Sequence, residues 1–147
     1  MVSYETMLNA KRQTQDANIH SKNYFRFEKF EVWKDAREFV SLIYKLTSKF
    51  PDEEKFGLIN QIRRAALSIV LNIAEGSAKG SDLDLRRFLR MAQGSTNEVV
   101  SALYIALDLN LLSKTDFQKA YDFSHRINAK INSFIKALSV KRIALSN

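Results

Sequence analysis

The chain has 147 residues, 46% of them hydrophobic and 27% charged, which is the composition of a globular protein with one sizeable core. It contains no cysteine, and this excludes disulfides, thiolate catalysis and thiolate metal sites. Its net charge is +7, and the charge is distributed unevenly along the chain, with an excess of Lys and Arg in the C-terminal third that could attract phosphate groups.

The sequence lacks the apolar runs that mark targeting and membrane segments. Its N-terminal residues do not resemble a signal peptide, and no stretch approaches the roughly 18–20 apolar residues of a membrane span. We therefore expect a cytoplasmic protein with no membrane partner.

The two ends of the chain differ in composition from its middle. Residues 1–24 are rich in Asn, Gln, Ser, Thr and Lys without an apolar period, which predicts a flexible polar N-terminal arm or a short helix that docks only on a partner. His20 lies in this arm, where we expect it to be solvated. The organised domain is predicted over residues 25–140, and residues 141–147 form a basic C-terminal tail.

Two amphipathic helices are predicted in the first half of the organised domain. From Phe30, the segment FEVWKDAREFVSLIYKLTSKFP repeats apolar residues at helical spacing, and Pro51 ends it because a residue before proline is pushed out of the α region. A second helix is expected from about Glu53 to Glu75, with Gly76 as its C-terminal stop.

Two more helices follow, each with a capping signal at its start. Ser81 and Asp84 have the spacing of a capping box, so the third helix is expected to begin beside Ser81 and to end near Asn110. Ser113 and Asp116 repeat the pattern for the fourth helix. Because short connections force neighbouring helices to run antiparallel, the sequence predicts an all-α, antiparallel up-down-up-down four-helix bundle.

The second helix carries more apolar surface than one bundle core can use. Its apolar arc extends well past half the circumference, whereas a peripheral helix needs a stripe of only about 100°. The excess would be an exposed patch in a monomer, so we expect a homo-oligomer; the alternative is that the N-terminal arm covers the patch within one subunit. The predicted interface residues, from the second and third helices, are Arg63, Leu67, Val70, Ala74, Gly94 and Glu98.

Basic residues cluster on the third and fourth helices. Arg86 and Arg90 share one helix face by the i, i+4 rule, and Arg87 flanks them. Residues 111–147 carry seven Lys or Arg against two Asp or Glu, for a charge of +5. These clusters are typical either of a phosphate-binding surface or of an ordinary solvated helix face.

No set of residues has the pattern of a catalytic or metal site. His20 and His125 do not belong to Glu-x-x-His pairs, and neither has an arginine at the offset of helical ribonucleases. The turn GSAKGS, residues 76–81, lacks the pattern of a nucleotide-binding loop, although the helix start that follows could hold an anion. We therefore predict no catalytic residues, no metal, no cofactor and no enzymatic activity; a site assembled between subunits is the less favoured alternative.

Three segments resemble a known family in their order and spacing: FEVWKDAREFVSLIYKLTSKFP, FGLINQIRRAALSIVLNIAEGSAKGS and FLRMAQGSTNEV. They are similar to small bacterial four-helix bundle proteins encoded in intervening sequences of large-subunit rRNA genes, and to the related accessory variability proteins of diversity-generating retroelements. The resemblance covers about Phe30 to Leu138. The chain departs from the family in its longer arm and in Ala78-Lys79, where a Gly-Arg or similar pair is common.

The resemblance implies a subunit of a ring-like homopentamer that engages nucleic acid and has no enzymatic activity. In the retroelement relatives the ring binds a reverse transcriptase and its template RNA. We expect the residues that match the family motif to act mainly in folding and assembly. They are Arg63, Arg64, Asn72, Glu75, Gly76, Ser95 and Glu98. Nucleic-acid contact would then fall on the exposed basic residues Lys79, Arg86, Arg87, Arg90, Lys119, Arg126 and Lys130.

Two functions remain open from the sequence. The first is an accessory ring that binds nucleic acid, preferably RNA, with a reverse transcriptase as a candidate partner. The second is a protein-interaction scaffold without a direct nucleic-acid role.

Overall fold

The computed structural model describes residues 3, 6–7, 9–12, 24–54 and 56–146, apart from the side chains of residues 142 and 143. Within these residues the structure contains helices and no strand, which confirms the all-helical prediction. In chain order the elements are η1 (Arg26–Lys29), α2 (Glu31–Thr47), η2 (Asp52–Glu54), α3 (Leu58–Ser77), α4 (Asp82–Asp108) and α5 (Lys114–Ser146). No helix in the described part of the chain is long and apolar enough to cross a membrane.

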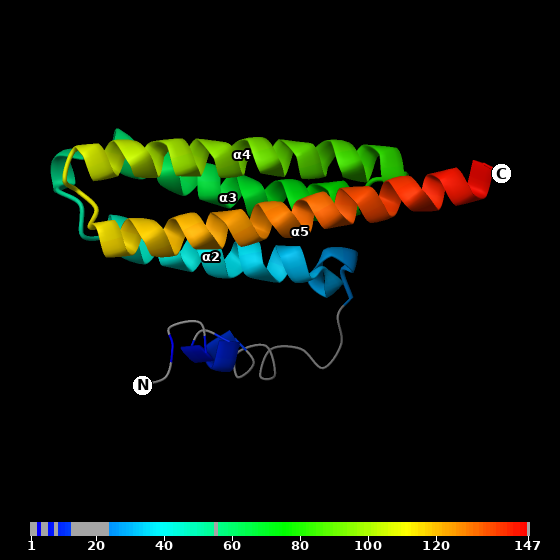
Figure 1. Ribbon diagram of the computed structural model, residues 1–147, viewed down its shortest axis with the longest axis horizontal. Coiled ribbons are helices and arrows are strands. Elements are labelled where there is room, and N and C mark those ends of the chain that lie inside the picture. Colours follow the sequence, from blue (N-terminus) through cyan, green and yellow to red (C-terminus); the bar gives the residue numbers. More distant parts are fainter. Residues whose placement is uncertain (1–2, 4–5, 8, 13–23, 55, 147) are drawn as a thin grey trace.

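The four long helices lie side by side, and each runs opposite to the one before it (Figure 1). Contacts join α2 to α3, α3 to α4, α4 to α5 and α5 back to α2. Because each long helix has two neighbours in this closed order, the side formed by α2 and α3 is opposite the side formed by α4 and α5. We refer to these two sides as the α2–α3 flank and the α4–α5 face.

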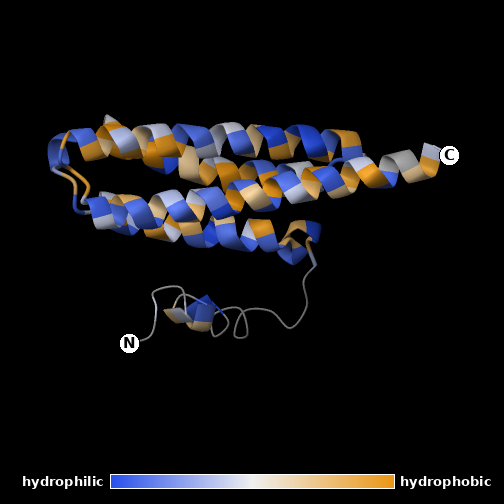
Figure 2. Ribbon diagram, viewed as in Figure 1, coloured by the Kyte–Doolittle hydropathy of each residue, from blue (hydrophilic) through white to orange (hydrophobic). Residues whose placement is uncertain are grey.

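The core lies between the four long helices, where the apolar stripe of each one meets the others. Figure 2 shows hydrophobic and hydrophilic residues alternating along each helix, as amphipathic packing requires. Phe39 of α2, Ile69 of α3, Leu89 of α4 and Ile127 of α5 are all fully buried. The apolar stripes predicted from helical spacing therefore form the core.

Both predicted capping signals are present. Ser81 Oγ accepts a hydrogen bond from the Asp84 backbone N–H at 3.1 Å, and Ser113 Oγ accepts one from Asp116 at 3.1 Å. These bonds satisfy backbone donors that have no partner within the first turn of α4 and α5. From its cap, α5 continues to Ser146, so residues 141–146 of the expected tail are helical.

The second helix begins later than the sequence predicted, which was at about Glu53. Asp52–Glu54 forms the short turn η2, and α3 begins only at Leu58, after Gly57. Gly57 has φ −102° and ψ −107°, which is not a helical conformation, so the helix does not extend back to Glu53 as the sequence predicted.

The prediction that Gly76 is the C-terminal stop of the second helix is also wrong. Gly76 is buried inside the last turn of α3, which continues to Ser77. A Cβ atom at this position would lie 2.6 Å from Phe88 Cβ of α4. The glycine is therefore required for the close approach of α3 and α4 rather than for a left-handed helix end.

The described part of the expected N-terminal arm contacts α2. Arg12 donates a hydrogen bond of 2.5 Å to Glu38 Oε1, and its guanidinium lies 3.7 Å from Asp35 and 3.8 Å from Glu31. The rest of the arm, which includes His20, lies outside the described residues.

Candidate nucleic-acid interface

Side-chain contacts along their length hold the helices α4 and α5 in one antiparallel register. Arg86 Nη1 donates a hydrogen bond of 2.9 Å to Ser139 Oγ, and Gln93 Nε2 donates one of 2.6 Å to Asn132 Oδ1. Further along, the rings of Tyr104 and Tyr121 meet edge to face with centroids 6.4 Å apart. This register sets which residues of the two helices share a level on the α4–α5 face.

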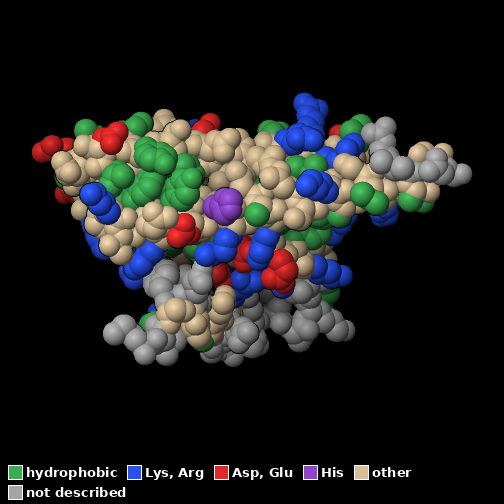
Figure 3. Space-filling model, viewed as in Figure 1, with side chains coloured by type: hydrophobic (Ala, Val, Ile, Leu, Met, Phe, Trp, Pro, Cys, Tyr) green, Lys and Arg blue, Asp and Glu red, His purple; other side chains and the backbone are tan. Residues whose placement is uncertain are grey.

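Basic side chains from both helices meet at the end of the face that contains the start of α4. Arg87 and Arg90 are exposed, and within the described chain neither forms an ion pair. Lys136 lies between the α5 residues that bind Gln93 and Arg86, so the register places it at the level of Arg90. Lys141 Nζ lies 4.0 Å from Asp82 Oδ2 at the start of α4. Figure 3 shows Lys and Arg side chains gathered over this half of the face.

We call this group the basic end; it consists of Arg86, Arg87, Arg90, Lys136 and Lys141. The sequence predicted its three arginines and missed its two lysines. The only signal for the lysines was the +5 charge of residues 111–147, because spacing along one helix does not show which residues of another helix lie beside it.

Lys79 lies near the basic end but is partly neutralised. It follows α3 in the turn to α4, its Nζ is 3.9 Å from Glu75 Oε1, and it lies 5.2 Å from the centre of the Phe88 ring. Its charge is therefore shared with a carboxylate of its own subunit, as the charge of Lys141 is shared with Asp82.

The three basic residues predicted on the fourth helix do not belong to the basic end. Lys130 pairs with Asp35 of α2, and Arg126 lies 4.8 Å over the ring of Phe123, which packs on Phe39 of α2. Lys119 shares this side of α5 by helical spacing. The seven basic residues predicted as one nucleic-acid set therefore lie on two different sides of the subunit.

The predicted interface residues of the second helix lie on the α2–α3 flank. Leu67 is 37% exposed and Leu71, one turn further, is 61% exposed, with Val70 and Ala74 half-buried beside them. Arg63 Nε donates a hydrogen bond of 2.9 Å to Thr47 Oγ1, and its guanidinium lies 4.3 Å over the Tyr44 ring. Arg63 therefore joins α3 to α2 within one subunit.

The two interface residues predicted on the third helix lie on another surface. Gly94 and Glu98 are exposed on the outer side of α4, and a Cβ at Gly94 would meet nothing within 4 Å in the described structure. At this level of the bundle, the contact of α4 with α3 is made by Ser95, whose Oγ donates a hydrogen bond of 2.8 Å to Ser68 Oγ.

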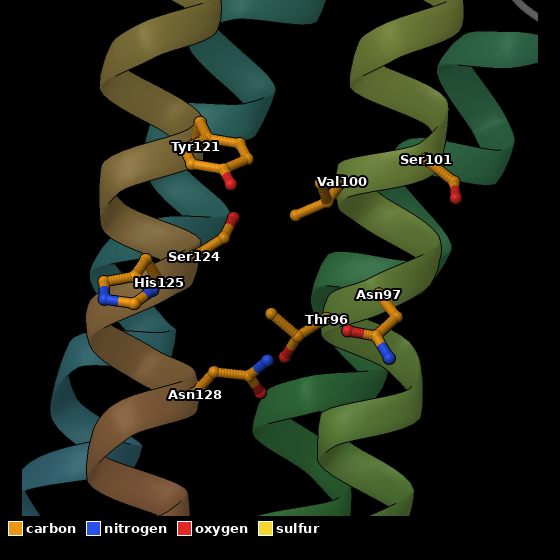
Figure 4. Close-up of a pocket in the computed structure, with 8 residues that line it drawn as sticks. All are labelled: Thr96, Asn97, Val100, Ser101, Tyr121, Ser124, His125 and Asn128. Carbon is orange, nitrogen blue, oxygen red and sulfur yellow. The ribbon is translucent and has the colours of Figure 1, made fainter.

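A polar pocket of about 310 Å³ opens between α4 and α5, beyond the basic end. From α4 it is lined by Thr96, Asn97, Val100 and Ser101. From α5 it is lined by Tyr121, Ser124, His125 and Asn128. Figure 4 shows Thr96 and Val100 pointing toward Ser124 and Asn128 across the gap. The sequence did not predict this pocket, because the pocket is formed by residues of two helices and depends on how those helices face each other.

The pocket has an aromatic boundary at one end and a polar boundary at the other. The rings of Tyr104, Phe117 and Tyr121 pack together at 4.8–6.4 Å between centroids, and Figure 3 shows this apolar patch next to His125. At the other end, the hydrogen bond between Gln93 and Asn132 bridges the two helices. The α4–α5 face therefore presents, in order, a basic end, a neutral polar pocket and an aromatic patch.

Comparison with known proteins links the chain to one family. The family model described as 23S rRNA-intervening sequence protein matches residues 28–133. A crystal structure from Bacteroides thetaiotaomicron VPI-5482, described as a protein with unknown function from the S23 ribosomal protein family, is similar with a TM-score of 0.67 and 27% sequence identity. The similarity covers 71% of this chain and 98% of that chain. No curated protein matches.

Proposed function

The chain belongs to the 23S rRNA-intervening sequence protein family, and from that premise we propose that it is a non-enzymatic, homo-oligomeric four-helix bundle that binds RNA as an accessory factor. The observation that carries this proposal is the basic end, where Arg87 and Arg90 are exposed without an ion-pair partner in the described chain. Cations that are not neutralised by their own subunit are free to release counterions from a phosphate backbone. RNA is the nucleic acid that the sequence resemblance implies, because the retroelement relatives bind a template RNA.

The α2–α3 flank supports the proposed self-association. Exposed leucines at positions 67 and 71 lie on one surface with Val70 and Ala74, and a contiguous apolar patch of this kind is typical of a contact surface. A ring needs two different surfaces that meet head to tail. The outer side of α4, with Gly94 and Glu98, is the second surface that we propose, and a ring of five subunits rests on the family resemblance.

The RNA-binding proposal is tested by measuring affinity for a labelled single-stranded RNA over a range of salt concentrations. We expect tight binding at low salt that weakens steeply as salt rises. The double variant Arg87→Gln/Arg90→Gln should reduce the slope of log affinity against log salt by roughly 1.4, since each phosphate contact to single strands contributes about 0.7.

The matched control is Lys130→Gln, which removes a basic residue whose charge is already paired with Asp35 on another side of the subunit. This variant should leave the slope nearly unchanged. Undetectable binding at low salt, or an unchanged slope in the double arginine variant, would contradict the proposal.

A second candidate function is a protein-interaction scaffold, which the exposure of Leu71 on the α2–α3 flank also favours. Here the flank would bind a partner protein, with the reverse transcriptase of the retroelement relatives as the partner that the resemblance implies. RNA affinity distinguishes the two, because a scaffold without a direct nucleic-acid role shows no RNA binding even at low salt.

A further inference from the structure

The α4–α5 pocket exists because the facing side chains at its level are short. On either side of it, long side chains bridge the helices, with Tyr104 against Tyr121 at one end and Gln93 bonded to Asn132 at the other. Between these levels Thr96 and Ser124 face each other, and each is only 1% exposed. The pocket therefore has a closed polar floor and a fixed length.

The floor of the pocket presents hydrogen-bond acceptors. Thr96 Oγ1 donates to the backbone oxygen of Ala92 at 2.9 Å, and Ser124 Oγ donates to that of Ala120 at 2.8 Å. Each hydroxyl has used its hydrogen and keeps lone pairs that can accept. Asn128 Oδ1 is buried and has no hydrogen-bond partner within the described residues. A buried acceptor without a partner is costly, so the floor suits a ligand edge that carries N–H donors.

The walls of the pocket select a neutral, flat group. No Lys, Arg, Asp or Glu lines it, so neither a phosphate nor a cation would find a charged partner there. Tyr121 supplies an aromatic wall on which a planar ring can stack. The volume of about 310 Å³ lies at the lower end of the range for small-molecule pockets, which suits one ring system rather than a large ligand.

The basic end lies on the same face at a distance that a nucleic-acid strand can span. Arg90 precedes Asn97 by two helical turns, which is about 10 Å along α4. That distance corresponds to two or three nucleotides of a strand. A strand whose phosphates contact the basic end can therefore place one base over the pocket.

We propose that the α4–α5 pocket binds one unstacked base of a single-stranded RNA, and that it prefers a base with an exocyclic amine, such as cytosine, over uracil. Cytosine presents two N4 amine hydrogens, whereas uracil presents a single N3–H flanked by two carbonyl oxygens. The amine therefore complements the acceptors of Thr96, Ser124 and Asn128 better than the uracil edge does. This inference rests on the proposed RNA-binding function and adds base selectivity to it.

The test compares the affinities of oligo(C) and oligo(U) of about 10 nucleotides, which have the same backbone charge and similar ring size. We expect the full-length protein to bind oligo(C) more tightly by roughly three- to tenfold, as one or two additional hydrogen bonds provide. Asn128→Ala should abolish this preference while the melting temperature shows that the variant is folded.

The control is Asn60→Ala, which removes the same side chain at an exposed position of α3. Because Asn60 does not line the pocket, this variant should keep the preference for oligo(C). Equal affinities of the unmodified protein for the two oligonucleotides, or a preference that persists in Asn128→Ala, would overturn the pocket assignment. The salt dependence carried by Arg87 and Arg90 would be unaffected, so the proposed function would stand.

A second measurement tests the pocket without relying on phosphate contacts. We expect titration with the nucleoside cytidine to shift the NMR resonances of the Asn128 side-chain amide and of His125, and uridine to shift them less. An absence of shifts at millimolar cytidine would overturn the assignment even if the protein binds no RNA, and the two failures are thereby distinguished.

Discussion

The α2–α3 flank and the α4–α5 face lie on opposite sides of one subunit and differ in what they leave exposed. On the flank, Arg63 is engaged by Thr47 and Tyr44, and the leucines at positions 67 and 71 remain accessible. On the face, Arg87 and Arg90 are exposed without ion pairs in the described chain, beside a neutral polar pocket. The apolar contact of the flank and the phosphate contacts of the face would therefore occupy different surfaces. The outer side of α4 is shared, because Arg87 lies two turns from Gly94 on the same side of the helix.

The largest effect is expected when charged residues are introduced on the α2–α3 flank, because they should prevent the homo-oligomer from forming. In the variant Leu67→Glu/Leu71→Glu, assembly would bury two carboxylates in an apolar contact, which is far more costly than leaving them in water. We expect light scattering to give the mass of the 16.9 kDa single chain in place of a homo-oligomer, with the helical content retained because both positions are exposed.

The control for this variant is Val140→Glu, at an exposed position of α5 outside the flank. Its mass should equal that of the unmodified protein. If the unmodified protein is itself a monomer, or if Val140→Glu dissociates it as fully as the double variant does, the flank is not the assembly surface.

A smaller effect, on the free energy of unfolding, is expected for a substitution between the two sides, where α3 packs on α4. In Gly76→Ala the new methyl group would lie within 2.6 Å of Phe88 Cβ, so the helices must separate. Overpacking of this kind costs about 1–3 kcal/mol, which chemical denaturation would detect as a lower free energy of unfolding.

Gly94→Ala is the matched control, because a methyl group there meets open space within the subunit. Alanine should raise the stability of the isolated subunit by up to about 1 kcal/mol through helix propensity. If Gly94 lies in the proposed ring contact, the same variant should also weaken assembly, and an unchanged mass would remove Gly94 from the interface. A Gly76→Ala protein as stable as the unmodified chain would refute the close-packing role of Gly76.

Local signals in the sequence predicted much of the fold. Ser81 and Ser113 were identified as caps because the serine and the backbone donor it binds are three residues apart. The apolar stripes gave the core because burial follows the helical period. Gly76 was misread because its reason is a close contact with Phe88 on another helix, which no local pattern reveals.

The candidate site was less predictable for the same physical reason. A helical wheel shows that Lys130 and Arg90 are polar positions, but it does not show that Lys130 faces Asp35 of α2 while Arg90 lies beside α5. The pocket depends on the register of two helices, and Thr96 and Ser124 look like ordinary core positions when each helix is considered alone.

The most direct test of the division between the two sides is photochemical crosslinking of bound single-stranded RNA, followed by mass spectrometry of the crosslinked peptides. The account predicts crosslinks on α4 and α5, at the basic end and at the pocket residues Tyr121 and His125. Crosslinks concentrated on the α2–α3 flank, around Leu67 and Leu71, would contradict it.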